Sequence, residues 1–481
     1  MKKKLDLIRF VQFHYCTGVN LDTFKTIFSR KRWSEKNKKV FLYNVVIGIV
    51  TLAVLSLINN STFGQKLLND LYDSIVVADF LDGAARPERI VDNLKLVEFD
   101  PFTYEHAENR GFWTPRHTLG ACIERAVDLG AKVVLVDFTV SRKVPVYLRD
   151  GQALDENELF LATLTRAVAK AEASEAVIVL PLVETAPPDD EYAHKLAALI
   201  QAHPAVVKTG LTSVMTDRYD ETVRNMLFYK VAGSTPGPDS VVLSMPVLAY
   251  LYASLPRPAA DQEVARLKGR IATDPDFTGA PLPGNGGKVV LYRYDPDREC
   301  LPAKLRYRIA DRDTYARFGV DEDPFFERRF RPAAWLSQSQ DQSQDGDKDA
   351  IVVIGSTNPE MGDAHKTPLG VMQGVYVLAN EVNMLMKAEQ INQNLYLKYL
   401  TDICSILILS ALFTHIPLTL SLMVLGFLIS SIRTSVASYL FIRFGIFLDA
   451  WVPMMGICFY ANIHNFVTSY IDFKTERTKC A

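Results

Sequence analysis

Long uncharged hydrophobic runs lie near both ends of the chain. Residues 41–58 and residues 403–432 contain no charged side chain, and residues 444–471 contain a single acid. An uncharged run of about 20 residues is long enough to cross a hydrocarbon core roughly 30 Å thick as a helix. We therefore predict four transmembrane helices, one within residues 40–59 and three within residues 396–470.

The region between these runs, residues 60–395, alternates short apolar strands with amphipathic helices. The predicted strands are Leu94–Phe99, Ala131–Val136, Ala176–Leu182, Val289–Tyr292 and Ile351–Ile354, and the predicted helices are Thr118–Leu129, Leu159–Ala171 and Val375–Met386. Apolar strands with intervening helices are typical of a largely parallel sheet that is flanked by helices. The predicted fold class is therefore α/β for this domain, with a separate α-helical membrane region.

Charge gives the predicted orientation. Residues 1–39 hold eleven Lys and Arg against three acids, a net charge of +8, whereas the whole chain has a net charge of −2. Positive residues beside a membrane span remain in the cytoplasm. Residues 1–39 and the short tail 471–481 are therefore assigned to the cytoplasm, and residues 60–395 to the periplasm. The prediction is a multi-pass protein of the bacterial inner (cytoplasmic) membrane.

The basic N-terminal segment also bears on the partners. Its Lys and Arg side chains can contact anionic lipid at the inner surface of the bilayer. A nucleic-acid partner is not expected, because no neighbouring segment resembles a recognition helix. The membrane lipid bilayer is therefore the first predicted partner.

Three acids follow the predicted strands. Asp100 and Asp137 come directly after apolar runs, and Asp363 lies in the loop after Ile351–Ile354. Ligands of open α/β sheets bind beyond the carboxyl ends of the strands, so these acids are candidate ligand-binding residues. The alternative is structural, because an Asp at the end of a strand often caps a helix or a turn.

Arg116 is the candidate counter-charge for Asp137. A buried carboxylate without a partner costs several kcal/mol, and Arg116 begins the helix that leads into the strand before Asp137. The planar guanidinium of an Arg suits a carboxylate. We expect Arg116 to pair with Asp137 and Asp363 to face the same crevice, either as a structural clamp or as part of a ligand site.

Other motifs argue against an enzyme or a metal site. The eight His and six Cys residues show no metal-ligand spacing. The segment 284–288 resembles the end of a P-loop, but Leu282 occupies the first glycine position. The strand before Asp137 lacks the second acid of a phosphatase motif, and there is no nucleophile elbow. No catalytic residue, metal or cofactor is predicted. Cys122 is interpreted as a buried thiol, with a Cys122–Cys300 disulfide as the alternative.

A series of short motifs follows one another along the chain. They are Trp113-Thr114-Pro115-Arg116, Gly130-Ala131-Lys132-Val133-Val134-Leu135-Val136-Asp137, Asp155 to Leu164, Asp220-Glu221-Thr222-Val223-Arg224, Val353-Ile354-Gly355 with Asp363, Thr367-Pro368-Leu369-Gly370, Gly374-Val375, Ala379-Asn380, and Phe444-Gly445 with Pro453. In order and spacing, the chain resembles the CHASE2 family of bacterial extracytoplasmic sensor domains over roughly residues 60–465. It departs from the family at Glu221, where a turn glycine is usual, and at Leu378, where a His is common.

The resemblance implies a sensor that passes a signal across the membrane, usually to a kinase, cyclase or similar domain after the last helix. Only about fifteen residues follow Phe466. We therefore expect a membrane-anchored sensory or binding protein without an effector domain of its own. It would act through an unidentified membrane or envelope protein, bind a small molecule in the outer domain, and form an oligomer. The alternative is a structural subunit of an envelope-spanning assembly.

Overall fold

The computed structural model describes the greater part of the chain between residues 62 and 391 and short segments outside it. The described residues are 38, 41–50, 62–106, 113–149, 152–182, 190–212, 214–217, 220–232, 237–274, 277, 279–284, 288–292, 304–320, 323–337, 348–391, 403–404, 407, 410 and 437–444. The chain divides into two compact units, Asp73–Asn392 and the combination of Met1–Tyr72 with Gln393–Ala481. The first unit contains the central sheet.

The central sheet has six strands in the order β13-β1-β14-β2-β5-β6, and all neighbouring pairs are parallel. The strands are β1 (Leu94–Phe99), β2 (Val133–Asp137), β5 (Val177–Pro181), β6 (Val207–Gly210), β13 (Arg329–Phe330) and β14 (Ile351–Ser356). Strands buried on both faces need apolar side chains at consecutive positions, which explains the runs in β2, β5 and β14. The late strand β14 lies between β1 and β2, so Gly355 is opposite both Glu98 and Asp137.

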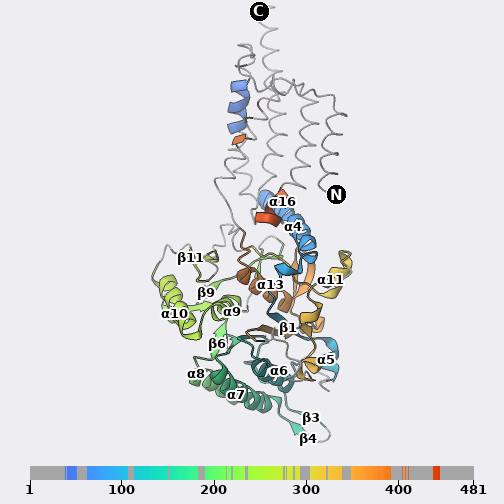
Figure 1. The fold of residues 1–481 in the computed structure, drawn as a ribbon, viewed down its shortest axis with the longest axis vertical. Coiled ribbons are helices and arrows are strands. Elements are labelled where there is room, and N and C mark those ends of the chain that lie inside the picture. Colours follow the sequence, from blue (N-terminus) through green and yellow to red (C-terminus); the bar gives the residue numbers. More distant parts are fainter. Residues whose placement is uncertain are drawn as a thin grey trace, which may run out of the picture. The chain divides into compact units, whose positions relative to one another are not determined.

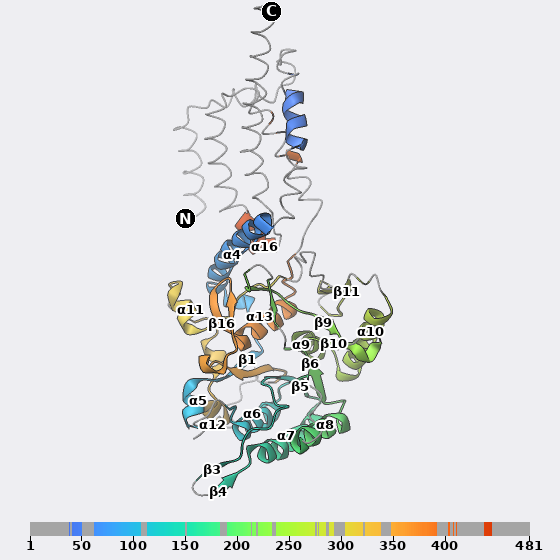
Figure 2. The same cartoon turned by 180° about the vertical axis from the view of Figure 1, so that it is seen from behind.

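Helices cover both faces of the sheet (Figure 1 and Figure 2). One face carries α6 (Arg116–Asp128), α7 (Glu156–Ser174) and α8 (Glu191–Ala202), and the other carries α9 (Met245–Ser254) and α13 (Gly374–Met386). The core beneath α6 and α7 includes Phe99 and Phe160, which are fully buried. It also contains Cys122, a free buried thiol as predicted, whereas Cys300 lies outside the described residues.

The unit Asp73–Asn392 also contains the helices α5 (Pro101–His106), α10 (Arg257–Thr273), α11 (Arg312–Arg317) and α12 (Pro332–Ser337), and the two-stranded pairs β3 (Tyr147–Arg149) with β4 (Gln152–Leu154), β7 (Met215–Thr216) with β8 (Val223–Asn225), β9 (Tyr229–Val231) with β10 (Val241–Leu243), β11 (Gly279–Pro281) with β12 (Val290–Tyr292), and β15 (Ala364–Thr367) with β16 (Gly370–Gln373). The helix α4 (Thr62–Ala84) includes residues of both units, and α16 (Ala437–Phe444) belongs to the other unit.

The α/β part of the predicted fold class is confirmed, with one strand assigned to the wrong sheet. The predicted strands Leu94–Phe99, Ala131–Val136, Ala176–Leu182 and Ile351–Ile354 correspond to β1, β2, β5 and β14 of the central sheet. The predicted strand Val289–Tyr292 instead forms β12, which pairs antiparallel with β11. A short apolar run predicts a strand but contains no information on its partner, and this explains the error.

The prediction of four transmembrane helices is wrong for the part of the chain that the structure describes, because no helix there is both long and apolar enough to cross a membrane. Residues 41–50 are helical, but they rise about 15 Å, roughly half of a hydrocarbon core. The longer helix α4 contains several charged residues, among them Lys66 and Asp79. Residues 51–58 and most of 396–470 lie outside the described residues.

Candidate functional site

A cavity of about 470 Å³ lies at the carboxyl ends of the central strands. Asp137 at the end of β2, Pro181 at the end of β5 and Ser356 at the end of β14 contribute to its wall. The remaining lining residues are Trp113, Thr114, Arg116, Phe138, Thr139, Arg142, Val144, Thr212, Met361, Gly362 and Asp363. Three of the four residues predicted from the sequence as ligand-binding, namely Arg116, Asp137 and Asp363, therefore line one cavity.

Asp137 forms no ion pair in the described part of the domain. Its carboxylate makes neither a hydrogen bond nor an ion pair with any described residue. Burial, reinforced by the negative charge of Asp363, raises the pKa of Asp137 to about 7, and His365 acts in the opposite direction. His365 Nε2 itself lies 2.9 Å from Asp363 Oδ1. Near neutral pH, the carboxyl group of Asp137 is therefore divided between its protonated and charged forms.

Arg116 does not provide the charge that Asp137 lacks, so the predicted Arg116–Asp137 ion pair is wrong. Arg116 Nη1 donates to Asn157 Oδ1 at 2.7 Å, and Nη2 donates to the carbonyl of Arg142. Its guanidinium also lies 4.8 Å from the ring centroid of Tyr192. These contacts hold the segment after β2, because the carbonyl of Arg142 in that segment accepts a hydrogen bond from the guanidinium.

Asn157 holds the same segment from a second side. Its side chain accepts from Val144 N at 2.9 Å and donates to Val144 O at 2.7 Å. Asn157 and Arg116, itself a lining residue, thus hold the part of the cavity wall that contains Arg142 and Val144. These contacts give the cavity a wall of defined shape, which is a requirement for selective binding.

Asp100 lies away from the cavity lining and has a structural role. Its Oδ1 accepts from Thr103 N at 2.9 Å and from Thr103 Oγ1 at 2.6 Å at the start of α5. Its other oxygen pairs with Arg331 Nε at 2.8 Å. The alternative interpretation of strand-end acids, helix capping, therefore describes Asp100.

Sequence reasoning missed Glu381, a buried acid of α13. Its side chain is 5% exposed, and its Oε1 has no hydrogen-bond partner among the described residues. Burial raises the pKa of Glu381 well above its usual value, and the charge of Asp137 adds to this effect. An acid on the predicted buried helix Val375–Met386 was the available signal, because buried acids without partners are rare in folded proteins.

Two glycines bring the acids and α13 together. A Cβ atom on Gly374 would collide with the carboxylate of Asp363, and one on Gly355 would collide with Val375. The missing side chain at Gly374 therefore lets Asp363 lie against the first residue of α13, where the helix dipole favours a negative charge. The missing side chain at Gly355 lets α13 start close to the end of β14.

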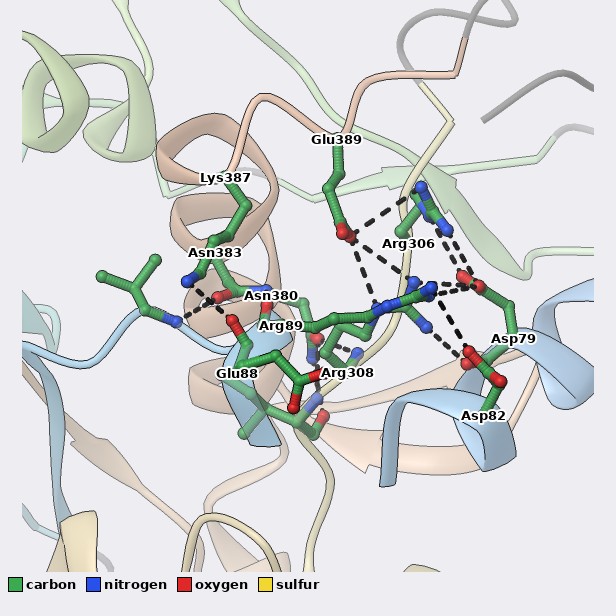
Figure 3. Close-up of polar contacts among 12 residues, drawn as sticks. Asp79, Asp82, Glu88, Arg89, Arg306, Arg308, Asn380, Asn383, Lys387 and Glu389 are labelled. Atoms are coloured by element: carbon green, nitrogen blue, oxygen red, sulfur yellow. Dashed lines mark hydrogen bonds and ion pairs between the residues drawn. The ribbon is translucent and has the colours of Figure 1, made fainter. Parts of the chain in front are cut away.

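A second polar cluster joins α4, the segment 304–310 and the end of α13 (Figure 3). We name it the Asp79 cluster, and its members are Asp79, Arg89, Arg306, Arg308 and Glu389. Asp79 is 1% exposed and accepts from Arg306 Nε at 3.0 Å, Arg306 Nη2 at 2.8 Å and Arg308 Nη2 at 2.8 Å. Glu389 Oε2 lies 3.4 Å from Arg308 Nε, and Arg89 Nη1 lies 3.5 Å from Asp79 Oδ1.

Asparagines of α13 extend this cluster into the backbone. Asn380 bonds to the backbone of Arg308 and of Ile309 with its side-chain amide. Asn383 accepts from Val91 N at 2.9 Å and donates to Arg89 O at 3.3 Å (Figure 3). The helix that begins beside Asp363 is therefore bound, at its other end, to the charged groups around α4.

The fold and the cavity define an α/β domain with space for a small ligand at the carboxyl ends of its strands. In a comparison with protein families, the CHASE2 domain matches residues 47–418. The chain therefore belongs to the CHASE2 family, as its motifs predicted, and contains an extracytoplasmic sensory domain. It matches no curated protein and no solved structure.

The family's turn before Arg224 has a clear structural reason. Arg224 is 1% exposed and makes paired hydrogen bonds of 2.7 Å with Asp220 and with Asp73 of α4. Arg224 also holds the pKa of Asp220 down, to about 2. Glu221, where the family usually has glycine, has a φ of 60°, a conformation that glycine adopts at no steric cost. The ion pair of Arg224 forms in a turn that has Glu221, and not a glycine.

Proposed function

We propose that this chain is a sensory protein of the bacterial inner membrane that binds a small polar ligand in its periplasmic domain and signals through a separate protein. The observation that supports ligand binding is the cavity of about 470 Å³ that contains the unpaired carboxylate of Asp137. Cavities of roughly 300–1,000 Å³ with a few convergent polar groups are the usual size of small-molecule sites. The proposal assigns this cavity a binding role and no catalysis.

The contacts of α13 offer a route for the signal. Its first residue, Gly374, lies against Asp363 in the cavity wall. Beyond its last turn, Glu389 pairs with Arg308, which bonds to Asp79 of α4. A ligand that moves Asp363 would therefore act on α13 directly and on α4 through the Asp79 cluster. A contiguous chain of packed and charged groups is a physical means of coupling two sites.

Two features of the sequence support the location and the need for a partner. The segment 1–39 has a net charge of +8 and is followed by the uncharged run 41–58, a combination typical of attachment to the inner membrane. The family's sensors usually act on an effector. Protease added to spheroplasts should therefore cleave within residues 60–395. Protection of this region in intact spheroplasts would contradict the periplasmic location.

Ligand binding is tested by thermal unfolding of the purified full-length chain in the presence of amino acids, amines, organic acids and sugars. At least one compound should raise the melting temperature, because a ligand that binds only the native state stabilises it. The shift should be lost in Asp137→Asn and kept in Asp128→Asn, which alters an acid on α6 that pairs with Lys170. Shifts of equal size in both variants, or no shift with any compound, would contradict the proposed site.

The partner is tested by cross-linking in cells followed by purification of the chain. A sensor should be recovered with one effector protein at a fixed ratio. Recovery with many copies of several envelope proteins would instead favour the alternative of a structural subunit.

A further inference from the structure

Of the two acids in the cavity wall, Asp363 pairs with His365, whereas Asp137 makes no ion pair with a described residue, and this asymmetry indicates the class of ligand. We propose that the cavity selects an organic cation, a ligand with an ammonium or guanidinium group that lies between Asp137 and Asp363. The inference rests on the proposed function and deepens it, because it names the chemical class of the ligand.

The unpaired carboxylate of Asp137 is the first observation. Two Arg residues, Arg116 and Arg142, line the same cavity, yet neither makes an ion pair with Asp137 among the described contacts. A charge removed from water costs several kcal/mol unless it is paired or neutralised. Below pH 7, a proton neutralises Asp137, because burial raises its pKa to about 7. A ligand cation can replace that proton and restore the charge at little cost.

Asp363 provides the second carboxylate. Gly374 allows it to lie at the N-terminus of α13, and His365 Nε2 approaches it to 2.9 Å. The N-terminus of a helix attracts negative groups. The charge of Asp363 is also close enough to Asp137 to disfavour ionisation there. Two like charges that repel one another are both relieved by one cation placed between them.

Glu381 is an independent sign that this region is built for a function other than stability. It is 95% buried, an oxygen of its carboxyl group has no partner among the described residues, and it senses the charge of Asp137. A folded protein retains a buried unpaired acid at a cost in free energy. The negative charges of Asp363 and Asp137 and the buried Glu381 therefore act on one another, and a cation bound at Asp137 relieves this repulsion.

The cavity fits an organic cation better than a metal ion. Within the described ranges, no group of three or more His, Cys, Asp or Glu side chains is arranged to hold a metal. The lining includes Trp113 and Phe138, and aromatic faces attract organic cations. The hydroxyl groups of Thr139 and Thr212 can bond to the polar remainder of a ligand. A volume of about 470 Å³ also far exceeds the space that a bare ion needs.

The pH dependence follows from the groups around Asp137. These groups are Asp363, His365 of β15, Glu381 of α13, Arg116 of α6 and Arg142 of the loop after β2. Because burial raises the pKa of Asp137 to about 7, a proton competes with the cation below this pH. The affinity for a cation should therefore be roughly tenfold higher at pH 8 than at pH 6.

The test is calorimetric titration of the purified full-length chain with probes of matched shape and different charge. The cations are 1,4-diaminobutane and agmatine, the neutral probe is 1,4-butanediol, and the anion is succinate. At least one cation should bind, with the pH dependence given above, and the neutral and anionic probes should not. Asp137→Asn and Asp363→Asn should each weaken cation binding at least tenfold at pH 8, and Asp128→Asn should bind like the unaltered chain.

The possible failures separate the inference from the proposed function. Binding of butanediol or succinate that depends on Asp137, with no binding of either cation, would overturn the inference and leave the ligand cavity intact. Binding of Ca²⁺ or Mg²⁺ in place of the amines would also overturn it. If the cations bind but Asp137→Asn binds them equally well, the inference is wrong about the site.

Discussion

The substitution Asp79→Ala should strongly destabilise the domain, because it removes the acid at the centre of the Asp79 cluster. Asp79 is 1% exposed and accepts two hydrogen bonds from Arg306 and one from Arg308. Without it, the remaining contacts of Arg308 and Arg306 include Glu389, at 3.4 Å and 3.8 Å, and the backbone carbonyl of residue 79, which bonds to Arg308 Nη1. Removal of one member of a buried ion pair costs about 3–5 kcal/mol, because a buried charge is left uncompensated.

The magnitude translates into a measurable change of thermal stability. For a domain of this size, a loss of about 3–5 kcal/mol corresponds to a fall in melting temperature on the order of 10 °C. Differential scanning calorimetry of the full-length chain measures it directly. The matched control is Asp92→Ala, because Asp92 is 85% exposed and pairs with Arg328 at 3.3 Å. This exposed pair should contribute less than about 1 kcal/mol.

Asp79→Ala should lower the melting temperature much more than Asp92→Ala does. If Asp79→Ala and Asp92→Ala lower the melting temperature equally, the Asp79 cluster is not a buried network of the kind inferred. Salt provides a second readout, because added salt screens exposed pairs far more than buried ones. The difference between Asp79→Ala and the unaltered chain should therefore persist at 1 M salt.

Three further predictions follow from single positions. Glu221→Gly should raise the free energy of unfolding by about 1 kcal/mol, measured by chemical denaturation, because it relieves a left-handed φ of 60°. An unchanged free energy of unfolding would show that Glu221 is unstrained. Gly374→Ala should lower the free energy of unfolding by about 1–3 kcal/mol in the same measurement, because the added Cβ displaces Asp363. The control Gly269→Ala has open space around its Cβ and should not destabilise the domain. Equal effects of the two variants would contradict the close approach of Asp363 to Gly374. Burial raises the pKa of Asp137 to about 7, so the stability it contributes is full below its unfolded pKa near 4 and is lost as the pH rises through 7. Asp137→Asn without ligand should therefore melt higher than the unaltered chain at pH 8, and a lower melting temperature would show a hidden partner.

The layered fold was predictable where a strand or helix has a pattern of its own. Leu94–Phe99 matches β1 residue for residue, because its mostly apolar sequence is followed by Asp100. The helix Val375–Met386 matches α13 within one residue, because Gly374 precedes a regular apolar stripe. By contrast, the strand Arg329–Phe330 has no pattern, since only its pairing with β1 makes it a strand. The helix Met245–Ser254 is apolar on all sides and shows no helical period.

The site was predictable only as far as parallel strands determine it. Such strands bring their carboxyl ends to one edge of the sheet, so Asp137 and the loop residue Asp363 meet in one cavity. The partner of Arg116 was not predictable, because it depends on where the loop after β2 places the carbonyl of Arg142. Glu381 escaped notice because its neighbours along α13 are those of an ordinary buried helix.

The most direct test of ligand binding is a crystal structure of the chain grown with 1,4-diaminobutane at pH 8. We expect density for the amine in the cavity, with one nitrogen about 2.7–3.2 Å from a carboxylate oxygen of Asp137 and of Asp363. A cavity that contains only water under these conditions, with the amine absent or bound elsewhere, would contradict the account.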